Sequence, residues 1–349
     1  MNEKRMRVAP LVAQHRFELT DAPVPDPGPG QIQVRVAYVG VCGSDLHNFA
    51  EGSVGDTPSV YPMVLGHEPS GVVVKTGTGV TGWAAGDEAA LEPAIYCYHC
   101  EFCLRGRHNL CSHIRFLSQP TDPGFFRDYV NLPAHNVLPS PKGVSLKELT
   151  LFEPLAVALH SLEFVRLGMG ETAAVFGSGP IGALTIAALK MSGAGRVFVV
   201  DPVAHRRDMA LIMGADVVLD PTQCHAGAEI LKATGGRGVD VAIDCATKNG
   251  SMDEALVATR SGGRVVYTGI PSEAEPTLKF HVARRKELAI FNVRRSNHES
   301  DLALQILGMD AKRFAPLLTH SLKLEKVQDA FTMLESYSDG VGKVCVDLT

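Results

Sequence analysis

The chain has 349 residues, of which 45% are hydrophobic and 20% charged, and its formal net charge is −5. This length favours about two globular domains, and the negative charge argues against a general role at nucleic acids or membrane surfaces. The charged residues 1–7 lead into no apolar secretory core, and the apolar run 181–189 is far shorter than a membrane span. Eight cysteines without a secretion signal indicate metal ligands in a reducing compartment, so we expect a cytoplasmic protein.

Residues 1–40 are predicted to be rich in β-strands. Apolar and polar side chains alternate with a period of two over 31–38, as they do in a half-buried strand. The prolines and glycines between residues 23 and 30 indicate an ordered turn before that strand.

Three side chains that follow this strand are of metal-ligand type. Cys42, His67 and Glu68 offer a thiolate, an imidazole and a carboxylate. Zinc accepts this set, and three protein ligands with an open fourth position are typical of catalytic zinc. Each residue also has an ordinary explanation: a buried thiol, a hydrogen-bonded histidine at a strand end, or a surface charge. The residues alone leave both interpretations open.

A second cluster has the spacing Cys-x2-Cys-x2-Cys-x7-Cys, formed by Cys97, Cys100, Cys103 and Cys111. Four thiolates at this spacing predict a closed structural zinc site. An iron–sulfur cluster is an alternative because the first three cysteines also match a ferredoxin-like run, but the fourth spacing disfavours it. A DNA-reading zinc ribbon is disfavoured because Glu101 offsets the basic residues of the lobe in an acidic protein.

Glu153 stands immediately before an apolar helical run, residues 155–160. A glutamate at this position is either an acid at a helix N-terminus, favoured by the helix dipole, or a carboxylate that faces a metal. The spacing leaves these two interpretations open.

The most informative motif is a glycine-rich turn between two apolar strands. A predicted strand over 171–176 is followed by Gly177-x-Gly179-x-x-Gly182 and then by a predicted helix to residue 191. In a dinucleotide-binding turn, the first glycine permits the tight bend, the second lets a pyrophosphate approach, and the third lets the helix pack on the sheet. Strand, glycines and helix occur in the required order, so we predict dinucleotide binding here. The alternative is a tight strand–helix turn that binds nothing.

The residues around this turn also bear on the choice of cofactor. Pro180 suits the first turn of the helix, where its missing N–H is no loss. Asp201, at the end of the second strand, would accept hydrogen bonds from an adenosine ribose and repel a 2′-phosphate. The sequence therefore favours NAD over NADP, although Arg206 and Arg207 soften that preference.

Helices and strands alternate through the rest of the chain. This alternation predicts a doubly wound parallel sheet. The predicted helices are 204–213, 226–233, 251–259 and 300–307, and the predicted strands are 216–219, 238–244, 264–267, 288–293 and 342–347.

Taken in order, these motifs resemble those of the zinc-containing medium-chain alcohol dehydrogenases over nearly the whole chain. The similarity is closest to the polyol branch, the sorbitol and xylitol dehydrogenases, through residues 91–93, 125–130 and 153–155. The resemblance implies an α/β protein with a Rossmann cofactor domain and a β-rich, GroES-like catalytic domain. The implied domains are 1–154 (catalytic, zinc-binding), 155–292 (dinucleotide-binding) and 293–349 (return to the catalytic domain).

The resemblance also implies roles for the metal-type residues. Cys42, His67 and Glu68 would bind a catalytic zinc, and Glu153 would hold the zinc-bound water or replace it as a ligand. A relay through Ser44 and His47 would carry the alcohol proton outward. A second, structural zinc would be bound by Cys97, Cys100, Cys103 and Cys111.

Contacts to NAD and to substrate are implied in the same way. The implied cofactor-binding residues are Gly177, Gly179, Pro180, Ile181, Gly182, Asp201, Arg206, Thr268, Gly269, Ile270, Val293 and Arg294. The implied substrate-binding residues are Asn48, Glu153, Arg294 and Arg295. Asn48 and Arg295 replace tyrosines that face the polyol tail in animal sorbitol dehydrogenases, so a different sugar alcohol or hydroxyl compound is compatible with this chain.

The sequence and the resemblance together predict an NAD-dependent zinc oxidoreductase that oxidises a secondary hydroxyl of a sugar alcohol to a ketone. L-threonine 3-dehydrogenase, or another secondary-alcohol or diol dehydrogenase, is the alternative on the same site. A non-enzymatic NAD-binding protein would be expected to lack metal ligands, and none is missing here. We expect a small-molecule substrate, no nucleic-acid or membrane partner, and a homotetramer, as in many relatives.

Overall fold

The structure is a computed structural model that describes residues 4–248 and 250–349. The chain divides into two compact units. The first unit comprises Met1–Glu153 and Ser300–Thr349, and the second comprises Pro154–Glu299. Which unit carries which of the predicted roles stays a prediction.

The second unit is built around a six-stranded sheet with the order β17-β16-β15-β18-β19-β20. Every neighbouring pair in it is parallel. The strands are β15 (Ala173–Phe176), β16 (Val197–Val200), β17 (Val217–Leu219), β18 (Val239–Asp244), β19 (Thr259–Tyr267) and β20 (Ala289–Asn292). The strand order reverses between β15 and β18, as it does in a doubly wound sheet. The predicted sheet is confirmed.

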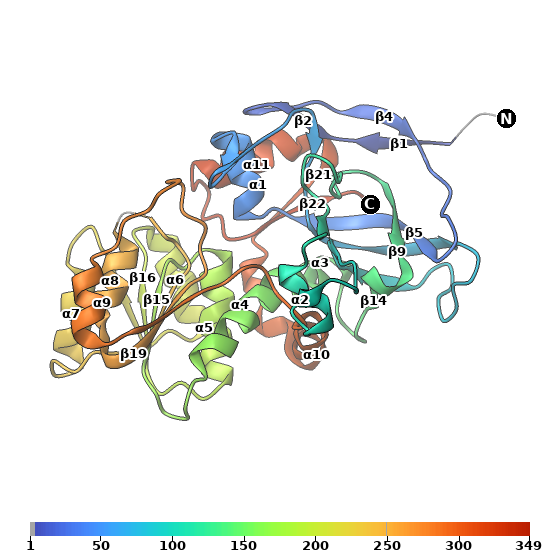
Figure 1. The fold of residues 1–349 in the computed structure, drawn as a ribbon. Coiled ribbons are helices and arrows are strands. Elements are labelled where there is room, and N and C mark those ends of the chain that lie inside the picture. Colours follow the sequence, from blue (N-terminus) through green and yellow to red (C-terminus); the bar gives the residue numbers. More distant parts are fainter. Residues whose placement is uncertain (1–3, 249) are drawn as a thin grey trace. The chain divides into compact units, whose positions relative to one another are not determined.

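One helix of this unit precedes the first strand of the sheet, and the others connect its parallel strands. They are α4 (Phe152–Val165, which begins at the end of the first unit), α5 (Pro180–Met191), α6 (Ala204–Met213), α7 (Ala226–Ala233), α8 (Ser251–Ala258) and α9 (Phe280–Lys286). Figure 1 shows α5 on one side of strands β15 and β16 and helices α8 and α9 on the other. Both faces of the sheet are therefore covered, which explains why β15, β16 and β18 are buried at every residue.

The end of helix α6 is determined by local sequence, whereas the start of strand β19 is not. Helix α6 ends before Gly214, whose φ of 110° suits glycine, as the sequence predicts. Strand β19 begins at Thr259, before the predicted start at residue 264, because Thr259 already pairs with Val239 ahead of a register shift in β18.

The first unit is rich in strands, as predicted. Its seven-stranded sheet has the order β14-β10-β9-β5-β22-β21, and β13 also pairs with β5. The sheet strands are β5 (Gln31–Gly40), β9 (Glu68–Thr76), β10 (Glu88–Leu91), β13 (Tyr129–Pro133), β14 (Val137–Pro139), β21 (His320–Lys323) and β22 (Val344–Asp347). Apolar side chains from these strands and from α11 form one buried core. Strand β22 pairs antiparallel with β5, so the end of the chain lies in this unit (Figure 1).

Shorter elements complete the first unit. The helices are α1 (Gly43–Ala50), α2 (Glu101–Leu104), α3 (Leu146–Leu149), α10 (Ser300–Asp310) and α11 (Val327–Glu335). The short strands are β1 (Arg5–Val8), β2 (Pro10–Ala13), β3 (Arg16–Phe17), β4 (Thr20–Pro23), β6 (Ser53–Val54), β7 (Thr57–Pro58), β8 (Met63–Val64), β11 (Ala94–Ile95) and β12 (Arg115–Phe116).

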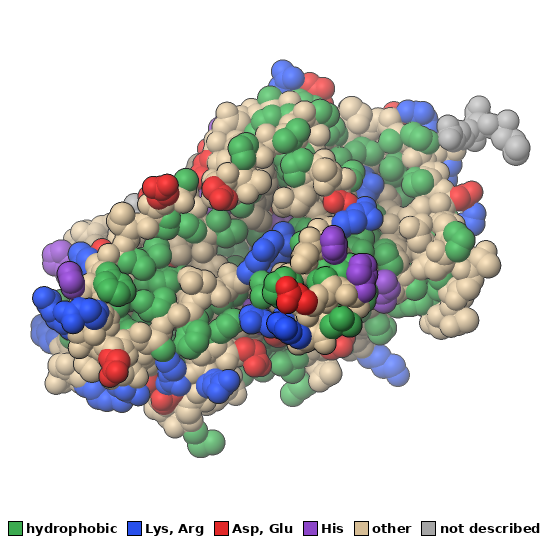
Figure 2. Space-filling view, viewed as in Figure 1, with side chains coloured by type: hydrophobic (Ala, Val, Ile, Leu, Met, Phe, Trp, Pro, Cys, Tyr) green, Lys and Arg blue, Asp and Glu red, His purple; other side chains and the backbone are tan. Residues whose placement is uncertain are grey.

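Surface charge and helix length bear on possible partners. On the face drawn in Figure 2, basic and acidic side chains are interspersed among apolar and polar ones. None of the helices in the described part of the chain combines the length and the apolar character that a membrane crossing requires.

Candidate metal centres and cofactor site

Strand pairing in the first unit brings Cys42, His67 and Glu68 together. Strand β5 ends at Gly40, two residues before Cys42, and Gly40 pairs with Glu68 at the start of β9. One ligand atom from each of the three side chains lies within 4.8 Å of the others. His67 and Glu68 are buried and Cys42 is half-buried. A thiolate, an imidazole and a carboxylate at this separation are a donor set that fits zinc.

The imidazole of His67 is held by a buried carboxylate that the sequence reading missed. Asp45 Oδ1 lies 3.2 Å from His67 Nδ1 and accepts a hydrogen bond of 2.7 Å from the hydroxyl of Ser118. Burial lowers the pKa of His67, but the charges of Asp45 and Cys42 outweigh it and raise that pKa above its ordinary value. Metal-binding histidines commonly use their second ring nitrogen in this way, which fixes the ring and its tautomer.

Glu68 has a second buried partner, Lys343, on the residue before β22. Both carboxylate oxygens of Glu68 lie 2.5 Å from Lys343 Nζ, which also donates a 3.0 Å hydrogen bond to the carbonyl of Val41. Lys343 and Glu68 are 1% and 0% exposed. The lysine therefore holds the carboxylate and the backbone beside Cys42 at the same time.

Glu153 lies in the first turn of α4 and is buried, but it is not a member of the Cys42, His67 and Glu68 group. Burial raises the pKa of Glu153 to about 8. The charge of His67 lowers this pKa, and the charge of Glu68 raises it. The carboxyl is therefore largely protonated at neutral pH in the metal-free chain, and a neutral carboxyl donates as well as accepts a hydrogen bond.

The raised pKa of Glu153 predicts that the metal-free protein loses stability as pH rises. Its folded-state pKa of about 8 exceeds the ordinary value of 4.5, so the unfolded state releases the proton first. Between about pH 5.5 and about pH 7.5 the free energy of unfolding should fall by about 2–3 kcal/mol. Urea unfolding of metal-stripped protein at both pH values measures this slope. Glu153→Gln should remove it, whereas Glu163→Gln, at an exposed position of the same helix, should retain it.

Helix α1 carries the residues implied in proton transfer. Ser44 Oγ lies 3.5 Å from His67 Nε2, and His47 Nδ1 lies 2.9 Å from Glu51 Oε2. Asn48 is buried, and its side-chain amide donates to the Ser44 carbonyl and accepts from Ser59. The amide of Asn48 is thus engaged inside the unit, and its contact with substrate stays a prediction.

The four predicted lobe cysteines also come together in the first unit. Ligand atoms of Cys97, Cys100, Cys103 and Cys111 all lie within 4.8 Å of one another. The sulfur of Cys111 lies 3.5 Å from that of Cys97, and the backbone N–H groups of Cys100 and His113 point at sulfur atoms. Backbone N–H groups of Cys103 and Ser112 lower the pKa of Cys100 to about 6. Four sulfurs supported in this way fit a closed metal site.

The glycine-rich turn in the second unit has the geometry of a dinucleotide-binding turn. Gly177 adopts a φ of 83°, and Gly179 is the N-cap of α5, with Pro180 in its first turn. A Cβ atom on Gly182 would lie 1.9 Å from the carbonyl oxygen of Gly177, so no larger residue fits there. The free N–H groups at the start of α5 are available for an anionic group.

Asp201 is buried behind this turn. Its carboxylate accepts hydrogen bonds from the backbone N–H groups of Ser178 (2.7 Å) and Val203 (2.8 Å). Arg206 lies next to Gly179, since a Cβ there would be 3.7 Å from the Arg206 guanidinium. Arg207 is engaged by the Asp201 carbonyl and, at 3.1 Å, by Asp220.

The ends of β18 and β19 supply further residues that the sequence reading only partly found. Asp244, which was missed, accepts hydrogen bonds of 2.9 Å from the N–H groups of Ala246 and Thr247. Its carbonyl accepts the N–H groups of Thr268 and Gly269. A buried acid at the end of a parallel strand is a signal that could have located this loop.

The remaining predicted positions follow these strands. Ile270 is exposed, and the N–H group of Val293 donates to the Tyr267 carbonyl. Arg294 and Arg295 come next, and Arg295 has a φ of 56°. Their contacts with cofactor or substrate stay predictions.

Comparison with known proteins decides the family. The family model of the alcohol dehydrogenase GroES-like domain matches residues 28–142, and that of the zinc-binding dehydrogenases matches residues 180–308. The chain is 32% identical to sorbitol dehydrogenase of Bacillus subtilis over 343 residues, which cover 98% of this chain and 97% of that protein. The chain belongs to the zinc-containing medium-chain alcohol dehydrogenases, in their polyol branch.

Two further similarities support this membership. This medium-chain dehydrogenase is 35% identical to a D-xylulose reductase A of Emericella nidulans. The similarity covers 91% of this chain and 90% of the Emericella protein. The structure of the alcohol dehydrogenase rspB from Escherichia coli CFT073 in complex with NADH matches with a TM-score of 0.90 at 27% identity, covering 99% of both chains. The predicted combination of a GroES-like domain with a Rossmann domain is confirmed.

Proposed function

We propose that this dehydrogenase oxidises a secondary hydroxyl of a sugar alcohol to a ketone, with NAD as the hydride acceptor. The observation that carries the proposal is the Cys42, His67 and Glu68 donor set, in a chain whose relatives include a sorbitol dehydrogenase and a D-xylulose reductase. Oxidation of an alcohol removes a hydride from carbon and a proton from oxygen, so the site must handle both.

The residues of the first unit have distinct parts in this proposal. Cys42, His67 and Glu68 would hold a zinc ion, which when bound supplies Lewis-acid polarisation of the substrate hydroxyl. Asp45 keeps the His67 ring in place, and Glu153, on the neighbouring helix, binds water or substrate as a hydrogen-bonding partner.

Proton removal would follow α1. Ser44 Oγ is within 3.5 Å of His67 Nε2, and His47, three residues later, lies on the same helix face. A hydroxyl and an imidazole in this order can pass a proton outward, a step typically worth about 10²–10⁴ in rate. Glu51 Oε2 lies 2.9 Å from Nδ1 of the His47 ring.

The second unit would bind the cofactor at the Gly177–Gly182 turn, with the ribose near Asp201. We also propose a second, structural zinc at the four lobe cysteines and a cytoplasmic homotetramer. Metal analysis per chain and the mass of the purified assembly test the last two proposals.

The preference for NAD should depend on Asp201. Asp201→Asn removes the charge that opposes a 2′-phosphate and keeps a hydrogen-bond acceptor, so the NAD to NADP ratio of kcat/KM should fall at least about tenfold. Steady-state rates with both cofactors measure the ratio. Asp208→Asn, at an exposed position on α6, is the matched control. An unchanged ratio in Asp201→Asn would contradict the assignment.

The substrate class is tested with a panel of sugar alcohols, aldonates, threonine and simple diols. The rate of NADH formation is measured for each compound. A sugar alcohol should give the highest kcat/KM. A panel in which threonine or a simple diol is preferred by more than about tenfold would replace the proposed substrate while leaving the metal and cofactor sites in place.

A further inference from the structure

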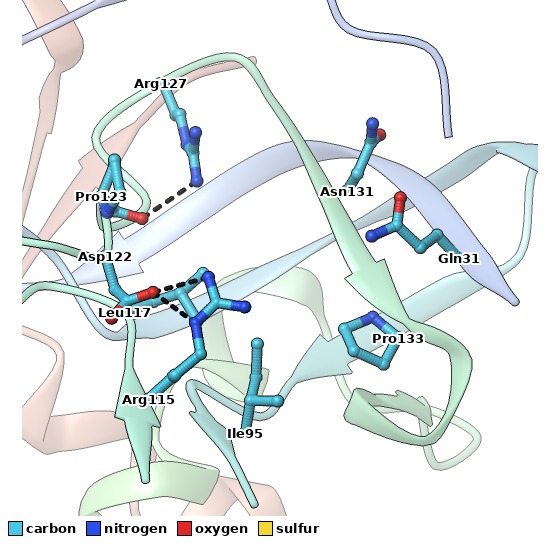
Figure 3. A pocket seen from close by; sticks show the side chains of 9 residues that line it. All are labelled: Gln31, Ile95, Arg115, Leu117, Asp122, Pro123, Arg127, Asn131 and Pro133. Atoms are coloured by element: carbon cyan, nitrogen blue, oxygen red, sulfur yellow. Dashed lines mark hydrogen bonds and ion pairs between the residues drawn. The ribbon is translucent and has the colours of Figure 1, made fainter. Parts of the chain in front are cut away.

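A pocket of about 130 Å³ opens in the first unit, and none of its lining residues belongs to the two cysteine-containing metal groups. Its polar lining comes from Gln31, Arg115, Asp122, Arg127 and Asn131 (Figure 3). A water molecule takes about 30 Å³ in the liquid, so the pocket has room for a solute of a few heavy atoms.

The two arginines of the pocket differ in how their charges are balanced. Arg115 is paired with Asp122, at 2.6 Å through Nη2 and 2.8 Å through Nε. Arg127 donates one hydrogen bond, of 2.9 Å, to the carbonyl of Pro123 and has no acidic partner among the described residues. Its Nε atom is buried and makes no hydrogen bond. The pocket therefore holds one positive charge in excess.

The neutral side chains add donors to this charge. Gln31 Oε1 accepts a 2.9 Å hydrogen bond from the N–H group of Gly28, which leaves the Nε2 donors of Gln31 without a partner in the described structure. Asn131 directs its own donors to the carbonyls of Pro25 and Asp26. The groups of Arg127 and Gln31 that make no hydrogen bond within the described structure are thus N–H donors, and of these the Arg127 Nε is buried.

Arg127 is half-buried, but its buried Nε has no acceptor, and an oxyanion would supply both that acceptor and a counter-charge. Burial lowers the pKa of Arg127 to about 10, so the side chain is still charged at neutral pH. Arg115, already paired with Asp122, closes one wall of the pocket and leaves Nη1 uncommitted.

The segments that build the pocket also support the His67 region. The N–H groups of Gly124 and Phe125 donate to the carbonyls of Val64 (2.7 Å) and Gly66 (2.9 Å). Ser118, beside the pocket residue Leu117, donates to Asp45. The backbone on this side of the pocket is therefore tied by hydrogen bonds to the segment that carries His67.

We propose that this pocket is a binding site for a small oxyanion of the phosphate class, held by the Arg127 guanidinium and the Gln31 amide. None of its lining residues is among those proposed to bind the alcohol, zinc or NAD, so it can fail while the proposed function stands. Inorganic phosphate is the probe.

The test is isothermal titration of the full-length, zinc-loaded enzyme with inorganic phosphate at constant ionic strength. Saturable binding to the wild type is expected. Arg127→Gln removes the charge, and Gln31→Glu keeps the acceptor for Gly28 while replacing the amide donors by a carboxylate, so both should weaken phosphate binding at least about tenfold. Arg127→Lys should retain part of the affinity. Arg16→Gln, at a side chain that is 65% exposed, is the control and should bind as the wild type does.

Phosphate should also raise the Tm of the wild type and of Arg16→Gln, but not that of Arg127→Gln or Gln31→Glu. Circular dichroism establishes that each variant is folded. The proposal is overturned if the wild type shows no saturable binding, or if folded Arg127→Gln and Gln31→Glu bind phosphate as tightly as the wild type. A change in oligomeric mass in Arg127→Gln, with no phosphate binding in the wild type, would instead assign the pocket to a second copy of the chain.

Discussion

Replacing Cys42 by alanine is expected to abolish turnover and to remove one zinc ion per chain while NAD binding is retained. The thiol is one of three donors within 4.8 Å of one another, and an imidazole and a carboxylate alone make a weak zinc site. Loss of the metal removes several kcal/mol of charge stabilisation, so kcat/KM should fall at least about 10³-fold. The glycine turn lies in the other unit, so NADH affinity, read by fluorescence titration, should change little.

A matched cysteine variant separates loss of metal from general damage. Cys224 is a half-buried thiol of the second unit that donates to the Asp220 carbonyl and belongs to neither metal group, so Cys224→Ala should keep both metals and full activity. Metal analysis by mass spectrometry gives the zinc content of both variants. Near-normal turnover in Cys42→Ala, together with undiminished zinc, would show that Cys42 is not a ligand.

The second unit could be predicted almost completely from sequence because its signals are local. Apolar, β-branched runs such as 197–200 mark strands that are buried on both faces. Gly177, Gly182 and Gly214 stand where the backbone needs a positive φ or a close approach. The start of β19 was missed because it depends on pairing with β18, which no local pattern encodes.

In the first unit, the sequence predicted which residues would meet but not what surrounds them. The ligand-type residues were recognisable by their chemistry, and strand pairing brings them together. Asp45, which faces His67, accepts a hydrogen bond from Ser118, 73 positions away in the chain. Glu68 pairs with Lys343, 275 positions away. Such pairs depend on how segments far apart in the chain pack together, so motif spacing alone cannot find them. A lysine inside a strand-like apolar run, as at Lys343, is nevertheless a local signal for a buried charge that needs a partner.

The buried pair of Glu68 and Lys343 predicts the largest effect on stability. Lys343→Met removes the ammonium group that lies 2.5 Å from both carboxylate oxygens and leaves the buried Glu68 without its counter-charge. Breaking a buried pair in this way costs about 3–5 kcal/mol of unfolding free energy. Urea unfolding of metal-stripped protein should show this loss. Lys75→Met is the control, because Lys75 makes an exposed ion pair of 2.7 Å with Asp26 that should be worth about 1 kcal/mol or less.

The same variant also tests whether Glu68 ligates zinc. A zinc ion bound to the Glu68 carboxylate would replace part of the charge that Lys343 supplies, so Lys343→Met should cost less in zinc-loaded protein than in stripped protein. Combining Lys343→Met with Glu68→Gln removes both charges and should recover most of the lost stability, as expected when two groups act as a pair. If Lys343→Met lost the same unfolding free energy with and without zinc, Glu68 would be the ion-pair partner of Lys343 and not a zinc ligand. Glu153 would then be the candidate for the third zinc ligand, because its buried carboxyl interacts electrostatically with His67 and Glu68.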